Sequence, residues 1–387
     1  MLQPYKGVNT SQFYVAELTP GVTPAAPIWQ ALRTTGGLPA VTRDALVSNE
    51  LNGSREVSYI RTGNKQVAGE YAIELSASSQ DELLAGAMTS SWQSGSTVAG
   101  LTIDVAASAK TFTRATGDFT TAVEVGDLVR FPGLAGGNAL PFIVTAVTPL
   151  VITGAAINHT LTDETDTASG LVIADKLETG NLCKTYSILT WFKGKCGGAD
   201  SFLLTKGVEF TGFTIEQAVN ANVSGSFPFI GLSQEVLTAP PAGSDFTQVV
   251  LDTKAFSSVD VSAFNGTAPL KLIDTFTITN DNAASAQFEL GNSSVAFVER
   301  GRASNTFSLA GKLYDTTLLN LFLNETQIEL TSILAGPDGA MSFTLKRADI
   351  TAATPEIGGP ESVTLSLEGQ ATGNSVLSSI VIQRIAY

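Results

Sequence analysis

Side chains that could do chemistry are few and scattered in this sequence of 387 residues. The single histidine, His159, lies in a stretch rich in Thr, Asn and Asp, and no neighbouring residue in the sequence would orient its ring as a general base. The acidic run 163–166 lacks the ligand spacing and the central glycine of a calcium loop. No hydrolase, zinc-protease, P-loop or dinucleotide-binding motif occurs. We therefore predict no catalytic, cofactor or metal site and no enzymatic activity.

The two cysteines, Cys183 and Cys196, do not suggest a site either. They form no Cys-x-x-Cys pair and have no histidine at metal-ligand spacing. Two cysteines are too few to cross-link a chain of this length, so we expect reduced thiols, as in a protein that folds in the cytoplasm.

Charge excludes another class of function. The chain carries 22 Lys and Arg against 36 Asp and Glu, a net charge of −14, which argues against a protein that grips nucleic acid through its phosphates. Charged residues make up only 15%, against about 25% in ordinary soluble proteins, while 43% are hydrophobic. Much of the surface must then be neutral and polar, as in large β assemblies that cover their surfaces with copies of themselves.

We expect neither export nor membrane insertion. The first ten residues have no basic and no apolar region of a signal peptide. The long uncharged stretch 131–158 is divided by Pro141 and Pro149 into pieces of strand length, shorter than the roughly 20 apolar residues of a span.

Alternation of apolar and polar residues dominates the chain and predicts strands. One hairpin is predicted around the turn 62–65, with a returning strand 67–75 that places Glu70 and Glu74 together on one face. The same alternation recurs at 213–215 and 363–368.

Two helices are predicted, and they indicate an internal repeat. The first runs over 79–92, with Ser79 as its N-cap and Glu82 completing a capping box. The second begins at an Asp315 cap. Each follows a strand, and the residues Arg61-Thr62-Gly63 upstream of the first match Arg300-Gly301-Arg302 upstream of the second.

This organisation predicts a mainly β fold of two tandem β-sandwich or barrel units, each with one packed helix, plus a small inserted β-barrel-like domain. The first unit comprises 1–95 and 176–237, and the second comprises 245–387. The insertion, 96–175, holds several short strands at the spacing of a small barrel. The Pro-containing stretch 238–244 is predicted to link the units.

Two segments carry a family resemblance. The segment 52–69 with the strand and helix that follow it, and the segment 206–233 with Gly225 and Gly231, resemble the tail tube proteins of long-tailed bacteriophages. The resemblance implies units that close an inner β-barrel in rings, which stack into a hollow tube through which DNA passes. It also implies contacts with the tape-measure, tail terminator and tail-tip proteins, and a place in the virion tail after assembly in the cytoplasm of the bacterial host.

Together with the predicted duplication, the resemblance predicts how many chains form a ring. Six units build a ring in the family, so two units per chain predict trimeric rings with pseudo-six-fold symmetry, with hexameric rings as the alternative. An acidic bore would let DNA slide without sticking. Candidate bore residues are Glu70, Glu74, Glu216 and Glu368. Candidate ring-stacking residues are Asn64, Lys65, Arg300 and Arg302.

Two other functions remain open from the residues alone. A carbohydrate-binding or hydrolytic tail-tip adhesin could bring two carboxylates together in space. However, 3 Trp and 7 Tyr against 20 Phe favour packing over sugar stacking. A surface-layer or pilus-like protein is the third possibility, and the lack of a recognisable signal peptide counts against it.

Overall fold

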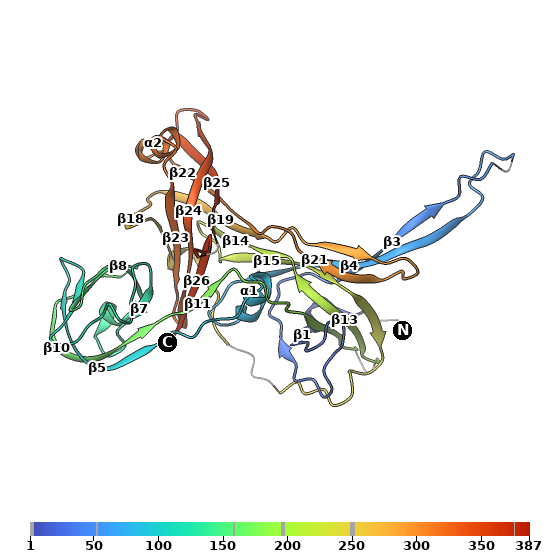
Figure 1. The fold of residues 1–387 in the computed structure, drawn as a ribbon, viewed down its shortest axis with the longest axis horizontal. Helices are drawn as coiled ribbons and strands as arrows, with labels where there is room; N and C mark the ends of the chain where they lie inside the picture. The colour runs from blue at the N-terminus through green and yellow to red at the C-terminus, as the bar shows by residue number, and fades with distance from the viewer. Residues whose placement is uncertain (1–3, 52, 158, 195–197, 248–251, 375) are drawn as a thin grey trace.

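The computed structural model describes residues 4–51, 53–157, 159–194, 198–247, 252–374 and 376–387. Strands dominate these residues, so the prediction of a mainly β protein is confirmed. Figure 1 shows a two-layered β body with a closed barrel at one end and a long β arm at the other. In the part of the chain that the structure describes, neither α-helix is long or apolar enough to span a bilayer.

The main sheet of the body is built from strands of both halves of the chain. Its strands in spatial order are β3 (Ala40–Val47), β4 (Ile60–Glu74), β15 (Ser224–Gly231), β14 (Gly212–Ala218), β19 (Ile273–Asp281), β22 (Ser304–Lys312), β25 (Thr364–Ala371) and β24 (Gly339–Glu356). All neighbours in this order are antiparallel. Alternation along β14 buries Phe213 and Ile215 and leaves Glu216 exposed, as a sheet with one covered face requires.

A second layer covers the apolar face of this sheet. In the first half it contains β1 (Thr10–Ala16), β2 (Gln30–Ala31), β12 (Tyr186–Phe192), β13 (Ser201–Phe210) and β16 (Ser233–Leu237). In the second half it contains β17 (Val261–Asn265), β18 (Ala268–Pro269), β23 (Ile328–Ala335), the first part of β24, and β26 (Ile380–Ala386). One apolar core runs through both halves and includes Tyr71, Phe213, Phe276 and Leu367.

The closed barrel consists of six short strands between α1 and the return of the chain to the body. They are β5 (Thr97–Ala106), β6 (Thr111–Arg114), β7 (Leu128–Arg130), β8 (Phe142–Val147), β9 (Val151–Ala156) and β10 (Glu164–Ile173). Stacked rings of Phe112 and Phe142, 4.4 Å between centroids, lie in its core. The next strand, β11 (Asp175–Glu178), returns to the body by pairing with β26.

The described residues form two short α-helices, and both begin later than predicted. Helix α1 spans Asp81–Ala87 and buries Leu83 to Ala87 against β13 and β14. The predicted capping box at Ser79 is wrong: the N-cap is Gln80, and the Ser79 hydroxyl accepts a hydrogen bond from Arg33 (2.9 Å). Helix α2 spans Thr317–Leu323, and the Asp315 carboxylate accepts the Thr317 N–H at 2.9 Å. Short 3₁₀ helices lie at Gly7–Asn9, Gly136–Ala139 and Ser258–Asp260.

The predicted turn at 62–65 is also wrong. Strand β4 runs through these residues without a break and pairs with β3, so the connection of this hairpin lies at 48–59 instead. Gly63 is required by a close approach rather than by a turn. It faces the irregular register of β3, where an added Cβ would come 3.0 Å from Cβ of Asp44.

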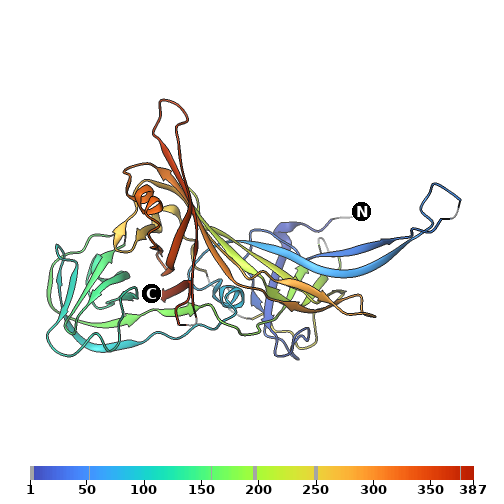
Figure 2. The ribbon, with the colours of Figure 1, turned by 45° about the horizontal axis from the view of Figure 1, so that its top comes forward.

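The distal parts of β3 and β4 form the arm, which leaves the body alone (Figures 1 and 2). A shorter hairpin of β20 (Ser285–Phe288) and β21 (Val295–Glu299) accompanies its base. The two are joined where the Lys65 N–H donates to the Ser293 carbonyl at 2.6 Å.

Candidate functional site: an acidic sheet face with two open edges

The junction between the two halves of the chain is a regular strand ladder. β14 pairs with β19 over seven consecutive residue pairs, from Gly212 opposite Asp281 to Ala218 opposite Thr275. Phe213, Ile215 and Ile278 point from this junction into the shared core. The halves are therefore fused by backbone hydrogen bonds into one sheet, whose outer face continues from β4 to β24.

Carboxylates line up across this outer face. A single row of cross-strand partners contains Glu74, Ser224, Glu216, Thr277, Ser308 and Glu368. Three of the four carboxylates predicted for the bore thus lie in one row, and all three are exposed. The fourth, Glu70, is exposed on the same face of β4, four residues and therefore two alternations before Glu74.

Sequence reasoning missed a fifth carboxylate on this face. Glu356, at the end of β24, is exposed and lies on the same side of the sheet as Glu368, four residues beyond the residue that faces Glu368. The alternation of residues 352–356 indicates a strand that would place Glu356 on this face, but Pro355 argues against a strand there. Lys312 also lies on this face, and its ammonium is 3.3 Å from the Asp274 carboxylate.

Both ends of the sheet are open. β3 pairs with β4 on one side, and no described strand pairs with its other side; all eight of its residues are exposed. At the opposite end, residues 349–356 of β24 pair only with β25 among the described strands. An open edge presents unpaired N–H and C=O groups to any strand that can align with it. The acidic face is thus bounded by two surfaces that can accept another chain.

The four residues predicted to join rings lie at the root of the arm, in different environments. Asn64 and Lys65 are half-buried within β4, and Arg302 is exposed just before β22. Arg300 instead pairs with Glu209 of β13 inside the chain and donates to the Leu182 carbonyl at 3.1 Å. Burial raises the pKa of Glu209, and the Arg300 guanidinium opposes this shift.

The tip of the arm carries an apolar surface that the sequence analysis did not single out. Leu51 is fully exposed, and Leu46, Val47, Val57, Tyr59 and Ile60 are each about half exposed or more. Six exposed apolar side chains on one thin hairpin are unusual for a surface that faces only water.

The described residues form no metal-binding cluster, because they contain no group of three or more His, Cys, Asp and Glu side chains that could hold a metal ion. His159 is half-buried rather than solvated, and burial lowers the pKa of its imidazole. Cys183 is exposed, and Cys196 lies outside the described residues.

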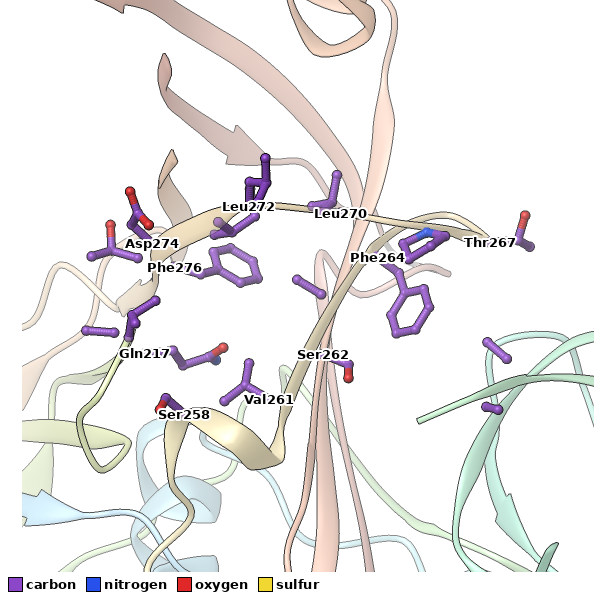
Figure 3. A pocket seen from close by; sticks show the side chains of 18 of the residues that line it. Gln217, Ser258, Val261, Ser262, Phe264, Thr267, Leu270, Leu272, Asp274 and Phe276 are labelled. Atoms are coloured by element: carbon purple, nitrogen blue, oxygen red, sulfur yellow. The ribbon is translucent and has the colours of Figure 1, made fainter. Parts of the chain in front are cut away.

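Figure 3 shows a cavity of about 450 Å³ at the junction of the halves. β17, β19 and the end of β14 line it, among them Phe264, Phe276 and Gln217. The Gln217 side chain is buried, and its Oε1 accepts a hydrogen bond from Ser332 at 2.7 Å. Asp274 also lines the cavity, and its carboxylate pairs with the Lys312 ammonium at 3.3 Å.

A sheet that spans both halves, with a polar acidic face and open edges, is typical of a subunit that polymerises. The model of the phage tail tube protein family matches residues 7–371, nearly the whole chain. The chain belongs to the phage tail tube protein family. No curated protein matches this sequence.

This tail tube protein is therefore a structural component of the virion tail. The match includes all six barrel strands and the strands of both halves of the body except β26. A structural role in the tail, rather than carbohydrate binding or hydrolysis, is what the family match supports.

Proposed function

We propose that this tail tube protein polymerises through the two open edges of its main sheet into rings, which stack into the hollow tube that DNA traverses. The observation that carries the proposal is the continuous sheet across both halves, with its carboxylates on the exposed face and an unpaired strand at each end. Joining such sheets end to end buries both edges and leaves no unpaired strand in a closed ring.

The exposed face would become the wall of the bore. Glu70, Glu74, Glu216, Glu356 and Glu368 then project toward the passing DNA. Like charge on the wall and on the phosphates removes the attraction that holds nucleic-acid-binding proteins to DNA. The apolar face, covered by the second layer, would lie toward the outside of the ring.

Each chain supplies two units of four strands to this wall. We propose units that comprise 1–95 with 176–237 and 245–387, joined through 238–244. Three chains then provide six units in pseudo-six-fold rings; a ring of six chains is the alternative. Contacts in such a ring are head to tail, because the β24 edge of one copy meets the β3 edge of the next.

The barrel would lie on the outside of the tube as an inserted domain over 96–175. Its core shares Ile333, Ala340 and Ile385, which come from the second layer of the body. The Gln383 side chain of β26 holds it further, because Oε1 accepts the Leu128 N–H (2.9 Å) and Nε2 donates to the Gly126 carbonyl (2.8 Å).

The arm would join ring to ring. Strands in closed barrels tilt by about 35–45° from the axis, so they run more nearly along the bore than around it. Figure 2 shows the arm, formed by the distal parts of β3 and β4, projecting from the body. In the proposed ring it would therefore extend past the rim. Its apolar tip would be buried on the next ring. Asn64, Lys65 and Arg302 would flank that contact at the rim, and Arg300 would brace the rim from inside the chain.

The remaining partners follow from the family. We propose that the bore surface contacts the tape-measure protein during assembly, and that the two ends of the tube bind the tail terminator and tail-tip proteins. Assembly would take place in the cytoplasm of the host bacterium, before the tail joins the virion.

Electron microscopy of the purified protein tests the proposal. Hollow tubes or stacked rings are expected. The mass of isolated rings is expected to be three times 40.3 kDa. Six times that mass would favour the hexameric alternative, and discrete particles without a bore would contradict the proposal.

A further inference from the structure

We infer that residues 38–42 of one copy pair antiparallel with residues 352–356 of the next copy, with Ala40 opposite Thr354. The inference rests on the proposed ring and names the edges and the register that close it. It is derived from the ladder that already joins the two halves inside each chain, because each half repeats the same strand pairings.

The repeat extends to the whole topology of the two halves. Equivalent elements are β1 and β17, β2 and β18, β4 and β22, α1 and α2, β12 and β23, β13 with β14 and the single long β24, β15 and β25, and β16 and β26. Equivalent strands have equivalent neighbours within each half; in addition, β26 pairs with β11, and β14 pairs with β19 of the other half. The segment that runs along β4 from Gly36 through β3 then corresponds to β19 and the hairpin after it.

Irregularities in register fix the correspondence residue by residue. The ladder between β12 and β13 shifts after the pair Tyr186–Val208, and the ladder between β23 and β24 shifts after the pair Ile328–Ala348. Val208 and Ala348 therefore occupy the same place. A bulge is a specific local feature, so its recurrence at one topological position is strong evidence of equivalence.

A second irregularity agrees with the first. Pairing with β15 shifts between Phe210 and Thr214, and pairing of β24 with β25 shifts between Ile350 and Ala352. Phe210 lies two residues after Val208, and Ile350 two residues after Ala348. Counting onward makes Thr214 equivalent to Thr354.

The partner strand is fixed by rows of facing residues. The first row contains Ala40, Ala68, Ile230 and Glu209. The second row contains Thr279, Thr306, Gln370 and Asp349. Glu209 and Asp349 are equivalent by the bulges, so Ala40 is equivalent to Thr279.

The ladder inside the chain now predicts the ladder between chains. Thr279 faces Thr214, with their hydroxyl oxygens 3.3 Å apart. Their equivalents, Ala40 and Thr354, are both exposed, and each lies on one of the open edges. A second copy placed by the relation between the halves therefore brings Ala40 opposite Thr354.

Two prolines meet in this register. Pro39 would face Pro355, where Ile278 faces Ile215 inside the chain. Proline cannot donate to a ladder and is confined to edges, so this pair lacks both hydrogen bonds. The Pro39 carbonyl already accepts a hydrogen bond from Gln234 Nε2 at 3.3 Å. The register therefore places the two missing hydrogen bonds at a site where the Pro39 carbonyl already has a hydrogen-bond partner within its own chain.

A missing wall supports the same placement. The cavity in Figure 3 is bounded by residues 217–219, at the end of β14, and also by Lys110, Ala155 and Ala156 of the barrel. The equivalent site in the first half, lined by β1, residues 31–38 and Glu74, is a wider cavity of about 800 Å³. The inferred pairing supplies its wall from residues 357–359 of the neighbouring copy.

The stagger of the strands is compatible with closure. The row of facing residues that starts at Glu74 on β4 crosses the sheet to Glu368 on β25 and Ala352 on β24. The inferred pairing continues this row to Thr42 on β3 of the next copy, whose partner on β4 is Gln66. The path from β4 of one copy to β4 of the next takes eight steps. Gln66 lies eight residues before Glu74 on β4, so the stagger is one residue per strand. Eight-stranded barrels with this ratio have a strand tilt of about 36°. Three chains at this tilt, with strands about 4.8 Å apart, enclose a backbone diameter of about 45 Å.

Engineered disulfides test the register in assembled tubes. In a background with both cysteines replaced by Ser, Ala40→Cys with Thr354→Cys is expected to give covalent trimers after mild oxidation. Thr214→Cys with Thr279→Cys is the matched positive control and should cross-link within one chain. Val41→Cys with Thr354→Cys places the thiols on opposite faces, and about tenfold less cross-linking is expected.

The outcomes separate the register from the proposed function. Tubes that form without the Ala40–Thr354 cross-link, or that cross-link equally at the mismatched pair, would overturn the register and leave the tail tube role intact. A protein that never assembles would contradict both. If the double variant does not assemble, hydrogen exchange of the unmodified protein decides: amides of 38–42 and 352–356 must become slower in tubes than in free chains, and equal rates would overturn the inference.

Discussion

The guanidinium of Arg384 lies over the indole ring of Trp92, with Cζ 4.3 Å from the ring centroid. The same guanidinium pairs with Asp81 at the start of α1 and with Asp175 of β11, 3.0 Å away. The indole N–H in turn donates to the Asp81 carbonyl at 2.9 Å. One side chain near the end of the chain therefore joins the helix of the first half to the strand that returns from the barrel.

Replacing this side chain should loosen that junction. Arg384→Ala leaves Asp81 largely buried without its cation, so we expect the free energy of unfolding to fall by about 3 kcal/mol. Urea unfolding followed by tryptophan fluorescence measures it. Arg302→Ala removes an exposed guanidinium and should change the free energy by less than about 0.5 kcal/mol. Equal effects of the two variants would contradict the role of Arg384.

Asp81 predicts a pH dependence of stability. Burial raises the pKa of its carboxyl to about 6, against the opposing effect of Arg384, and its Oδ1 has no hydrogen-bond partner among the described residues. The folded state then holds the proton more tightly than the unfolded state, where the pKa is about 4. Stability contributed by this group is present below pH 4 and is lost as the pH rises to 6. Asp81→Asn should reduce the change of the urea unfolding midpoint between pH 4 and pH 6. If the midpoint of this variant changes with pH as steeply as that of the unmodified protein, Asp81 is not responsible.

Gln383 should decide how firmly the barrel is docked. Gln383→Ala removes two buried hydrogen bonds and leaves the Leu128 N–H and the Gly126 carbonyl unpaired, for a loss of about 2–3 kcal/mol. Limited proteolysis should then cut faster at the connections near 94 and 174. Gln370→Ala, at an exposed site on the main sheet, is the control, and equal cleavage of both variants would count against the docking role.

Shortening the arm should separate ring formation from stacking. Replacing 45–61 by an Asn-Gly turn keeps the pairing at the base of the arm and removes the apolar tip. Single rings without tubes are expected in electron micrographs. The substitutions Leu51→Ser and Tyr59→Ser in the intact arm should weaken stacking less severely. Full-length tubes from the shortened chain would show that another surface joins the rings.

Charge reversal on the acidic face should make the bore retain DNA. Glu216→Lys with Glu368→Lys places cations in the row of facing residues, and we expect DNA to co-purify with tubes at low salt and to be released as salt rises. The control, Glu124→Lys with Asp118→Lys, carries the same charge change on the barrel. Equal DNA retention by both variants would indicate that net charge, and not the bore, is responsible.

The fold was predictable wherever alternation is regular. β14, β25 and the end of β4, residues 70–74, are recognisable because more and less buried residues alternate along them. The turn at 62–65 was predicted wrongly because Gly63-Asn64 resembles a hairpin turn. The glycine is instead needed for its close approach to Asp44, at a bulge in β3. Ser79 failed as a cap for a similar reason: its hydroxyl is taken by Arg33, a partner distant in the sequence.

The candidate site was partly predictable. Alternation shows that Glu70 and Glu74 share a face, but placing Glu216 in the row of Glu74 requires the pairing of β15 with both β4 and β14. Placing Glu368 in it also requires the pairing of β14 with β19, which links residues 65 positions apart. Arg300 was chosen for its match to Arg61, and its pairing with Glu209 depends on tertiary contacts that no local pattern contains. Glu356 was missed because Pro355 weakens the strand signal.

Among the described residues, the strand pairings of the main sheet recur in both halves, whereas the closed barrel occurs once. In the proposed ring of three chains, the bore and the outer surface would therefore obey different symmetries. A molecule inside the tube meets six nearly equivalent walls, whereas a molecule that grips the outside finds three barrels per ring, separated by three bare positions. A partner inside the proposed tube would therefore fit six-fold symmetry, and a partner on the outside would fit three-fold symmetry. An outer partner rotated by one unit, one sixth of a turn about the tube axis, would lose every contact with the barrels.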